Sequence, residues 1–148
     1  MNATLTIRPA NPNDWRAVKS LLEENELPLD GAREHLDSYL LAIDNGPVVG
    51  CAGTELYGDI ALLRSVAVAP LLQGGGIGKK LVSRLLEDAK HQQLSRIYLL
   101  TANAPEYFAK FGFEPVPIED APEVLKASAE FNGACPAGAT LMSLPLTT

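Results

Sequence analysis

Apolar and polar residues alternate, or recur with helical spacing, along most of the chain, and this pattern predicts its secondary structure. Alternating or continuously apolar segments predict strands, at residues 4–8, 39–44, 47–57, 60–68, 96–101 and 139–145, with one more opening at Gly112-Phe113. Apolar residues spaced three and four apart predict helices, starting near Asn13 or Asp14, then over 77–89, through 107–108 and over 121–131. Asn45-Gly46 is a favoured pair for a tight hairpin turn between the strands on either side.

The order of these elements favours a mixed α/β fold. Three strands joined by tight turns form an antiparallel meander, and a strand–loop–helix–strand–helix–strand run follows. A chain of 148 residues is long enough to bury one sizeable core, and no linker composition divides it. We therefore expect a single domain over residues 1–148.

Composition and charge argue against several classes of protein. The formal net charge is −6 and no basic block is present, so nucleic acid is not the expected partner. No apolar run approaches the ~20 residues of a membrane helix, and no signal peptide is expected at the N-terminus. Cys51 and Cys135 lack the spacing of metal ligands, so we expect no metal site and a reducing, cytoplasmic location.

Four glycines, at positions 74, 75, 76 and 78, lie between an apolar strand and an amphipathic helix. They do not fit a P-loop, because Gln73 stands where that motif needs glycine, and their spacing does not fit the dinucleotide fingerprint. A helix N-terminus presents unpaired N–H groups, and glycines let a phosphate approach them closely. The cluster therefore predicts either a backbone cradle for pyrophosphate or only a flexible turn before the helix.

Two segments resemble the signatures of the GCN5-related N-acetyltransferases, the GNAT superfamily. VAVAPLLQGGGIGKKL contains Gln or Arg, two residues, Gly, one residue, then Gly or Ala, here from Gln73 to Gly78. TANAPEYFAKFGFEP resembles the second signature through Ala104, Phe108 and Gly112-Phe113. The predicted element order is similar to the family fold over essentially the full chain. The resemblance therefore implies a central, mostly antiparallel sheet flanked by helices.

The resemblance also implies a binding site for acetyl-CoA as co-substrate. By position, the strand residues Val66, Ala67 and Val68 would contact the pantetheine arm, and Phe108 would line the same site. The loop residues that would hold the pyrophosphate are Gln73, Gly74, Gly75, Gly76, Ile77, Gly78 and Lys79.

Phe108 departs from the family pattern, because many members carry at this position a Tyr that protonates the leaving CoA thiolate. Phenylalanine has no proton to donate, so water or solvent would take that role. Tyr107 is adjacent, but neighbouring helical residues point about 100° apart, so its hydroxyl can face elsewhere. Thr101 is a second departure, since many members have Asn there.

A narrower resemblance is to the ArsN-type acetyltransferases associated with arsenic-resistance operons. The segments GCAGTELYGDIALLRSVAV, YLLTANAPEYFAKFGF and FNGACPAGATLM carry it. They are also similar to acetyltransferase domains that act on the α-amine of glutamate. Neither likeness fixes the acceptor.

Glu55 is our candidate for the general base. Acetyl transfer needs a neutral amine near the thioester, an oxyanion stabilised by a backbone N–H, here expected from strand 60–68, and a leaving thiolate. Glu55 lies near the end of strand 47–57, close to the expected cleft, and partial burial would raise its pKa. The alternative is a solvated glutamate at a strand end.

Arg64 lies inside an otherwise apolar strand, so its guanidinium needs a partner. Either it binds a substrate carboxylate or arsonate-like anion, with Ser65 beside it, or it forms a salt bridge to Glu55 or another acid. Cys135 is a further candidate for the substrate site, close to Cys51; the alternative is that both cysteines are small buried apolar residues.

Together these features predict an acetyl-CoA-dependent N-acetyltransferase acting on a small-molecule amine, an amino acid or amino-acid-like compound, with a link to arsenical resistance. Two alternatives stay open: acetylation of a protein N-terminus or lysine, and a non-catalytic acyl-CoA sensor, for which Phe108 is the best argument. No nucleic-acid or membrane partner is expected. GNAT-type domains often pair, so a homodimer is expected by analogy.

Overall fold

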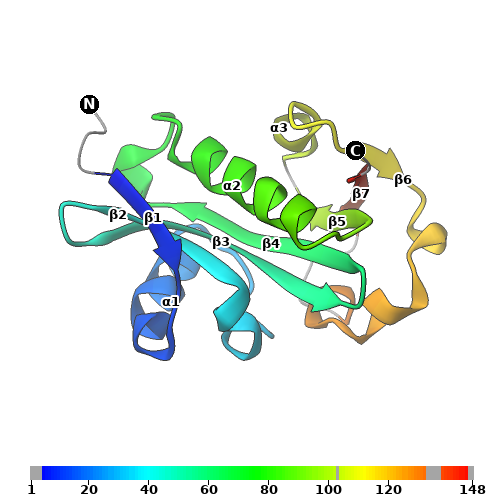
Figure 1. Ribbon diagram of the computed structural model, residues 1–148, viewed down its shortest axis with the longest axis horizontal. Coiled ribbons are helices and arrows are strands. Elements are labelled where there is room, and N and C mark those ends of the chain that lie inside the picture. Colours follow the sequence, from blue (N-terminus) through cyan, green and yellow to red (C-terminus); the bar gives the residue numbers. More distant parts are fainter. Residues whose placement is uncertain (1–4, 103, 133–137, 147–148) are drawn as a thin grey trace.

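The computed structural model describes residues 5–102, 104–132 and 138–146. These residues form one seven-stranded sheet in the order β1-β2-β3-β4-β5-β7-β6 (Figure 1). The strands are β1 (Leu5–Pro9), β2 (Tyr39–Asp44), β3 (Val48–Tyr57), β4 (Ile60–Val68), β5 (Arg96–Thr101), β6 (Glu114–Val116) and β7 (Thr140–Pro145). Neighbouring strands are antiparallel except for β4 and β5, which are parallel. The mixed, mostly antiparallel sheet predicted from the sequence is therefore confirmed.

Helices cover both faces of the sheet. They are α1 (Trp15–Glu24), α2 (Ile77–His91) and α3 (Pro105–Ala109), with 3-10 segments η1 (Pro12–Asp14), η2 (Arg33–Ser38), η3 (Pro70–Leu72), η4 (Ile118–Asp120), η5 (Glu123–Ala127) and η6 (Ala129–Phe131). Figure 1 shows α2 on one side of the central strands and α1 on the other. Among the described residues, no helix has the length and apolar character needed to cross a membrane.

Alternate residues of the central strands enter two separate apolar layers. Leu40 and Ala42 of β2 pack beneath α2, while Tyr39 and Leu41 pack on the side of α1. This is the period-two alternation from which the strands were predicted. The apolar stripe expected on the helix after the glycines is buried in the first of these layers, at Ile77, Leu81, Val82, Leu85 and Ala89.

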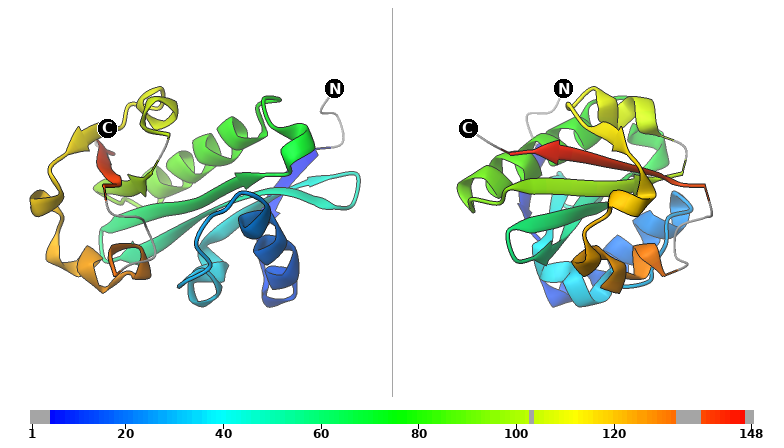
Figure 2. Two further views of the ribbon diagram at one scale, coloured as in Figure 1. Left: turned by 180° about the vertical axis from the view of Figure 1, so that it is seen from behind. Right: turned by 90° about the vertical axis from the view of Figure 1, so that its right-hand side faces the viewer.

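The prediction of a helix over residues 121–131 is wrong. Two short 3-10 turns, η5 and η6, occupy most of this segment. Pro122 has no N–H to donate and precedes the first turn, and Ser128 has extended backbone angles between the two. The Ser128 hydroxyl accepts a hydrogen bond from the Glu130 N–H at 3.1 Å. The fully buried Leu125 anchors the segment, which is drawn in orange beside the sheet in Figure 2.

Tyr39 crosses from β2 to β4 over Gly53. The two residues are opposite each other in the β2–β3 pairing, and a Cβ at position 53 would overlap the tyrosine ring. The ring is 1% exposed, and its hydroxyl is 2.7 Å from Ser65 Oγ. Glycine at position 53 thus makes room for a buried side chain that reaches the middle of β4.

Replacing Gly53 by alanine should destabilise the protein by at least about 2 kcal/mol, because the buried Tyr39 ring would have to move. Chemical denaturation monitored by circular dichroism measures this change. Gly75→Ala is the matched control, because its nearest neighbour is the Leu72 carbonyl oxygen, 3.4 Å from the added Cβ. Equal stabilities for the two variants would contradict the packing described here.

Candidate active site

A cavity of about 830 Å³ opens where β4 and β5 part. The two strands pair from Ile60–Arg96 to Leu63–Leu99, but β4 continues to Val68 and β5 to Thr101. The lining residues are Asn25, Glu26, Leu27 and Pro28; Leu63, Arg64, Ser65, Val66 and Val68; Gln73, Gly74, Gly76, Gly78 and Lys79; Leu99, Leu100, Thr101 and Ala102; Ala104, Tyr107, Phe108 and Glu130. Its volume is within the usual range for small-molecule and cofactor sites.

A β-bulge in β4 forms part of the cavity wall. Cys51 and Gly53 of β3 face Ala67 and Arg64, so two residues of β4 stand opposite one residue of β3. Ser65, the first of the two, has a φ of 61°, which is uncommon for a residue with a side chain. Its Oγ is hydrogen-bonded to Arg64 Nε at 3.1 Å as well as to Tyr39, and its carbonyl accepts from Cys51 Sγ at 3.3 Å. Both the side chain and the backbone of Ser65 are therefore hydrogen-bonded, which stabilises the bulge.

The glycine loop leads into the N-terminus of α2 at the other end of the cavity. Gly74 and Gly76 have φ values of 87° and 89°, which glycine adopts without strain. A Cβ at either position would meet nothing within 4 Å, so the loop surface is open. Helix α2 begins directly after Gly76 with no side-chain cap, so its first N–H groups are available to an anion.

Gln73 fixes the loop through side-chain hydrogen bonds. Its Nε2 donates to Asn25 Oδ1 at 2.8 Å and to the Val68 carbonyl at 3.1 Å. Asn25 Nδ2 donates to the same carbonyl at 3.2 Å and to Leu21 at the end of α1. The signature glutamine thus ties the loop to α1 and β4. No motif pointed to Asn25, which lies 48 residues before Gln73.

Tyr107 and Phe108 both line the cavity from α3. Their rings meet edge to face at a centroid distance of 5.1 Å. The Tyr107 hydroxyl is 2.9 Å from the place a Cβ on Gly78 would occupy. Burial raises the pKa of Tyr107, which keeps the hydroxyl protonated at neutral pH. Tyr107 therefore lines the cavity together with its neighbour Phe108, and its hydroxyl lies toward α2.

Arg64 is the centre of a buried polar cluster. Its side chain is 1% exposed, and its Nη1 donates to Glu55 Oε2 at 2.7 Å. Its Nη2 donates to the Pro28 carbonyl at 3.2 Å and lies 3.5 Å from Glu130 Oε2. The salt-bridge alternative for Arg64 is thus what the structure contains, and Glu130 is a partner that sequence reasoning missed.

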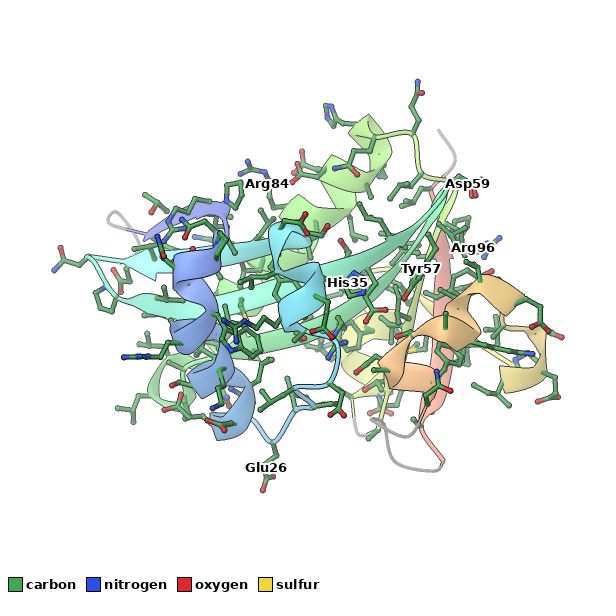
Figure 3. The ribbon with its side chains drawn as sticks, turned by 90° about the horizontal axis from the view of Figure 1, so that it is seen from below. Glu26, His35, Tyr57, Asp59, Arg84 and Arg96 are labelled. Carbon is green, nitrogen blue, oxygen red and sulfur yellow. The ribbon has the colours of Figure 1, made fainter. Side chains whose placement is uncertain are left out.

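Glu55 is also 1% exposed and does not line the cavity. Burial alone would raise its pKa, but hydrogen bonds from Tyr57, Arg64 and Ser128 together with the Arg64 charge lower it. The expected rise in pKa is therefore wrong, and so is the alternative of a solvated glutamate. His35 Nε2 lies 3.8 Å from Glu55 Oε1, and Figure 3 shows His35 beside Tyr57. No sequence pattern linked these distant residues.

Several other predicted site residues do not line the cavity. Ala67 and Ile77 are buried in the two apolar layers, and Gly75 is exposed without lining the cavity. Cys51 is fully buried, and its burial raises the thiol pKa to about 12. Cys135 lies outside the described residues. Among those described, no group of acidic, histidine or cysteine side chains is arranged to bind a metal ion.

Replacing Glu55 by glutamine should cost about 3 kcal/mol at neutral pH, because Arg64 would keep only Glu130 as a charged partner. The folded pKa of Glu55 lies below its ordinary 4.5. Its stabilising charge is therefore fully present above pH 4.5 and is lost as the pH falls through the folded pKa. Denaturation of both proteins between about pH 7 and pH 3 should show the difference shrinking in acid.

Glu123→Gln is the control for this comparison, because Glu123 pairs with Lys126 at an exposed site where ion pairs contribute little. A Glu55→Gln deficit that stays constant down to about pH 3 would mean that Glu55 is not an ionised partner of Arg64.

The model of the acetyltransferase (GNAT) family matches residues 6–113. An amino-acid acetyltransferase of Mycobacterium tuberculosis is 40% identical over 110 residues, covering 70% of this chain and 59% of that protein. One from Neisseria meningitidis is 29% identical over 140 residues, covering 88% of this chain and 32% of that protein. The chain thus spans about a third to three-fifths of these relatives.

Solved structures of other proteins share this fold. N-acetylglutamate synthase from Neisseria gonorrhoeae, complexed with coenzyme A and N-acetyl-glutamate, has a TM-score of 0.84 and 26% identity, covering 100% of this chain and 36% of that one. A Mycobacterium tuberculosis protein in complex with CoA has a TM-score of 0.80 and 26% identity, with 96% and 99% covered. The predicted fold is confirmed, and the family model covers more than half of the sequence: the chain belongs to the acetyltransferase (GNAT) family.

Proposed function

We propose that this chain is an acetyl-CoA-dependent N-acetyltransferase whose acceptor is the amine of an amino acid or amino-acid-like compound. One observation carries the proposal: the same cavity reaches from the glycine loop at the start of α2 to the β4 bulge and the buried Arg64 cluster. A long thioester can therefore extend from a phosphate cradle to a polar pocket. Relatives named amino-acid acetyltransferase, and neighbours crystallised with coenzyme A, support this reaction class.

The cofactor end of the cavity is built from backbone. We propose that the N–H groups of residues 74–79 hold the pyrophosphate and that backbone groups at Val66 and Val68 hold the pantetheine. The open surface at Gly74 and Gly76 suits close approach of an anion, and Lys79 adds a positive charge at the same place. When bound, acetyl-CoA supplies the activated acetyl group.

At the other end, the acceptor nitrogen must lose a proton before it attacks the thioester carbon. A C–N bond then forms, the C–S bond breaks, the nitrogen gives up a second proton to water as the amide forms, and the thiolate takes up a proton. We assign oxyanion stabilisation to a backbone N–H at the β4 bulge and the final proton to water, since Phe108 has none to donate. Glu55 stays our candidate acceptor of the ammonium proton, through intervening water because it is buried.

Arg64 is proposed to bind the carboxylate of the acceptor. Its contact with Glu130 at 3.5 Å is the longest of its contacts with Glu55, Pro28 and Glu130. An acceptor carboxylate entering the cavity would take the place of Glu130, with Ser65 and Cys135 as the other proposed contacts. The narrower likeness to ArsN-type enzymes makes an arsenical amino-acid analogue one acceptor to test.

Two other functions fit parts of the structure. Phe108 favours an acyl-CoA sensor without turnover, because the usual source of a proton is absent at that position. A macromolecular acceptor would use the same cofactor end with a protein amine. We further propose that the chain acts as one domain and pairs as a homodimer, which sedimentation measures directly.

Release of free thiol from acetyl-CoA should accelerate at least tenfold over the background rate when one or more α-amino acids is added to the purified protein. A panel of proteinogenic amino acids, an arsenical amino-acid analogue and a peptide with a free N-terminus separates the candidates. Mass spectrometry of the product identifies the acetylated nitrogen.

Binding of acetyl-CoA without turnover on any member of the panel would favour the sensor. Turnover on the peptide alone would favour a protein acetyltransferase. Either result would overturn the proposed small-molecule function.

A further inference from the structure

Tyr107 brings a hydroxyl to the cofactor end of the cavity, where the described residues leave it without a hydrogen-bond partner. The hydroxyls of Tyr39 and Tyr57 are each hydrogen-bonded within the structure. Tyr107 lines the cavity and is half-buried, but no described residue accepts from or donates to its oxygen. A half-buried hydroxyl without a partner, on a residue that lines a cavity, is a group that a ligand can satisfy.

The hydroxyl lies against a glycine. It lies 2.9 Å from the point where a Cβ on Gly78 would stand, and Val68 Cγ2 lies 3.7 Å from the same point. Gly78 is the second residue of α2, in the turn whose N–H groups face the proposed pyrophosphate site. The Tyr107 hydroxyl therefore lies where the first turn of α2 meets the end of β4.

The order Tyr107-Phe108 explains why the hydroxyl lies there. Moving a tyrosine by one position along a helix rotates its side chain by about 100°. The ring of Phe108 lines the cavity with no hydroxyl, while the hydroxyl of Tyr107 is directed toward α2. The GNAT pattern accepts Gly or Ala at position 78, but here the methyl group of alanine would occupy the space next to the hydroxyl.

We propose that Tyr107 is a positioning residue for the cofactor: its hydroxyl donates a hydrogen bond to a pyrophosphate oxygen of CoA, and Gly78 is glycine to make room for it. This inference rests on the proposed function. It assigns Tyr107 a contact with the pyrophosphate of the cofactor, not the protonation of the thiolate.

Tyr107→Phe should weaken binding of CoA about tenfold in isothermal titration calorimetry, because a hydrogen bond to a charged oxygen is lost. Binding of 3′-phospho-ADP, which carries the pyrophosphate but no pantetheine, should weaken by a similar factor in competition with CoA. The KM for acetyl-CoA should rise while kcat and its pH profile stay the same. Tyr98→Phe removes a tyrosine hydroxyl from β5 that does not line the cavity, and it should change none of these values.

A double-mutant cycle tests the pairing with Gly78. Gly78→Ala alone should weaken CoA binding about as much as Tyr107→Phe, because the methyl group displaces the hydroxyl. In the Tyr107→Phe background it should have less than a threefold effect, since the ring carbon Cζ is 4.0 Å from the added Cβ, an ordinary contact. Additive losses in the double variant would overturn the pairing.

The remaining outcomes separate this inference from the proposed function. If the original protein does not bind CoA, the proposed function fails and this inference fails with it. If it binds CoA and Tyr107→Phe binds equally well, only this inference is overturned. A fall in kcat with an altered alkaline limb of the pH profile would instead make Tyr107 a general acid and would also overturn it.

Discussion

The rest of the site depends on the ion pairs and hydrogen bonds formed by the buried guanidinium of Arg64. A charged group that is 1% exposed is stable only when it is paired and hydrogen-bonded. Its partners come from three different parts of the chain: Glu55 on β3, the Pro28 carbonyl before η2, and Glu130 at the end of the 3-10 segments. One side chain of β4 thus holds both flanking segments against the sheet.

The same residue stabilises the opening between β4 and β5. Arg64 Nε bonds to the hydroxyl of Ser65, whose left-handed backbone creates the bulge. Tyr39 and Cys51 bond to the same residue from the side of α1. Strand β4 therefore stays joined to β3 while its pairing with β5 ends at Leu63. The cavity is a consequence of this one-sided attachment.

Local patterns in the sequence were enough to predict the sheet and the glycine loop. The strands at 39–44, 60–68 and 96–101 were placed from alternation or apolar runs, which depend on neighbouring residues. Residues 121–131 were misassigned because the apolar spacing was helical, although Pro122 and the extended Ser128 prevent a continuous helix. The pKa of Glu55 was predicted in the wrong direction, since its sign depends on Tyr57, Arg64 and Ser128, contacts that only the folded chain brings together.

This difference in predictability follows from how the two ends of the cavity are built. The proposed cofactor end would use backbone N–H groups, which requires glycines at fixed spacing, and such spacing is visible as a motif. The proposed acceptor end is lined by side chains from distant segments, such as Arg64 and Glu130, and no spacing rule links them. Tyr107 is an intermediate case. Its place in the second signature can be identified from the sequence, but the direction of its hydroxyl depends on how α3 packs over Gly78. A motif therefore points to the proposed donor site before the proposed acceptor site, because the first is built from local structure and the second from tertiary contacts.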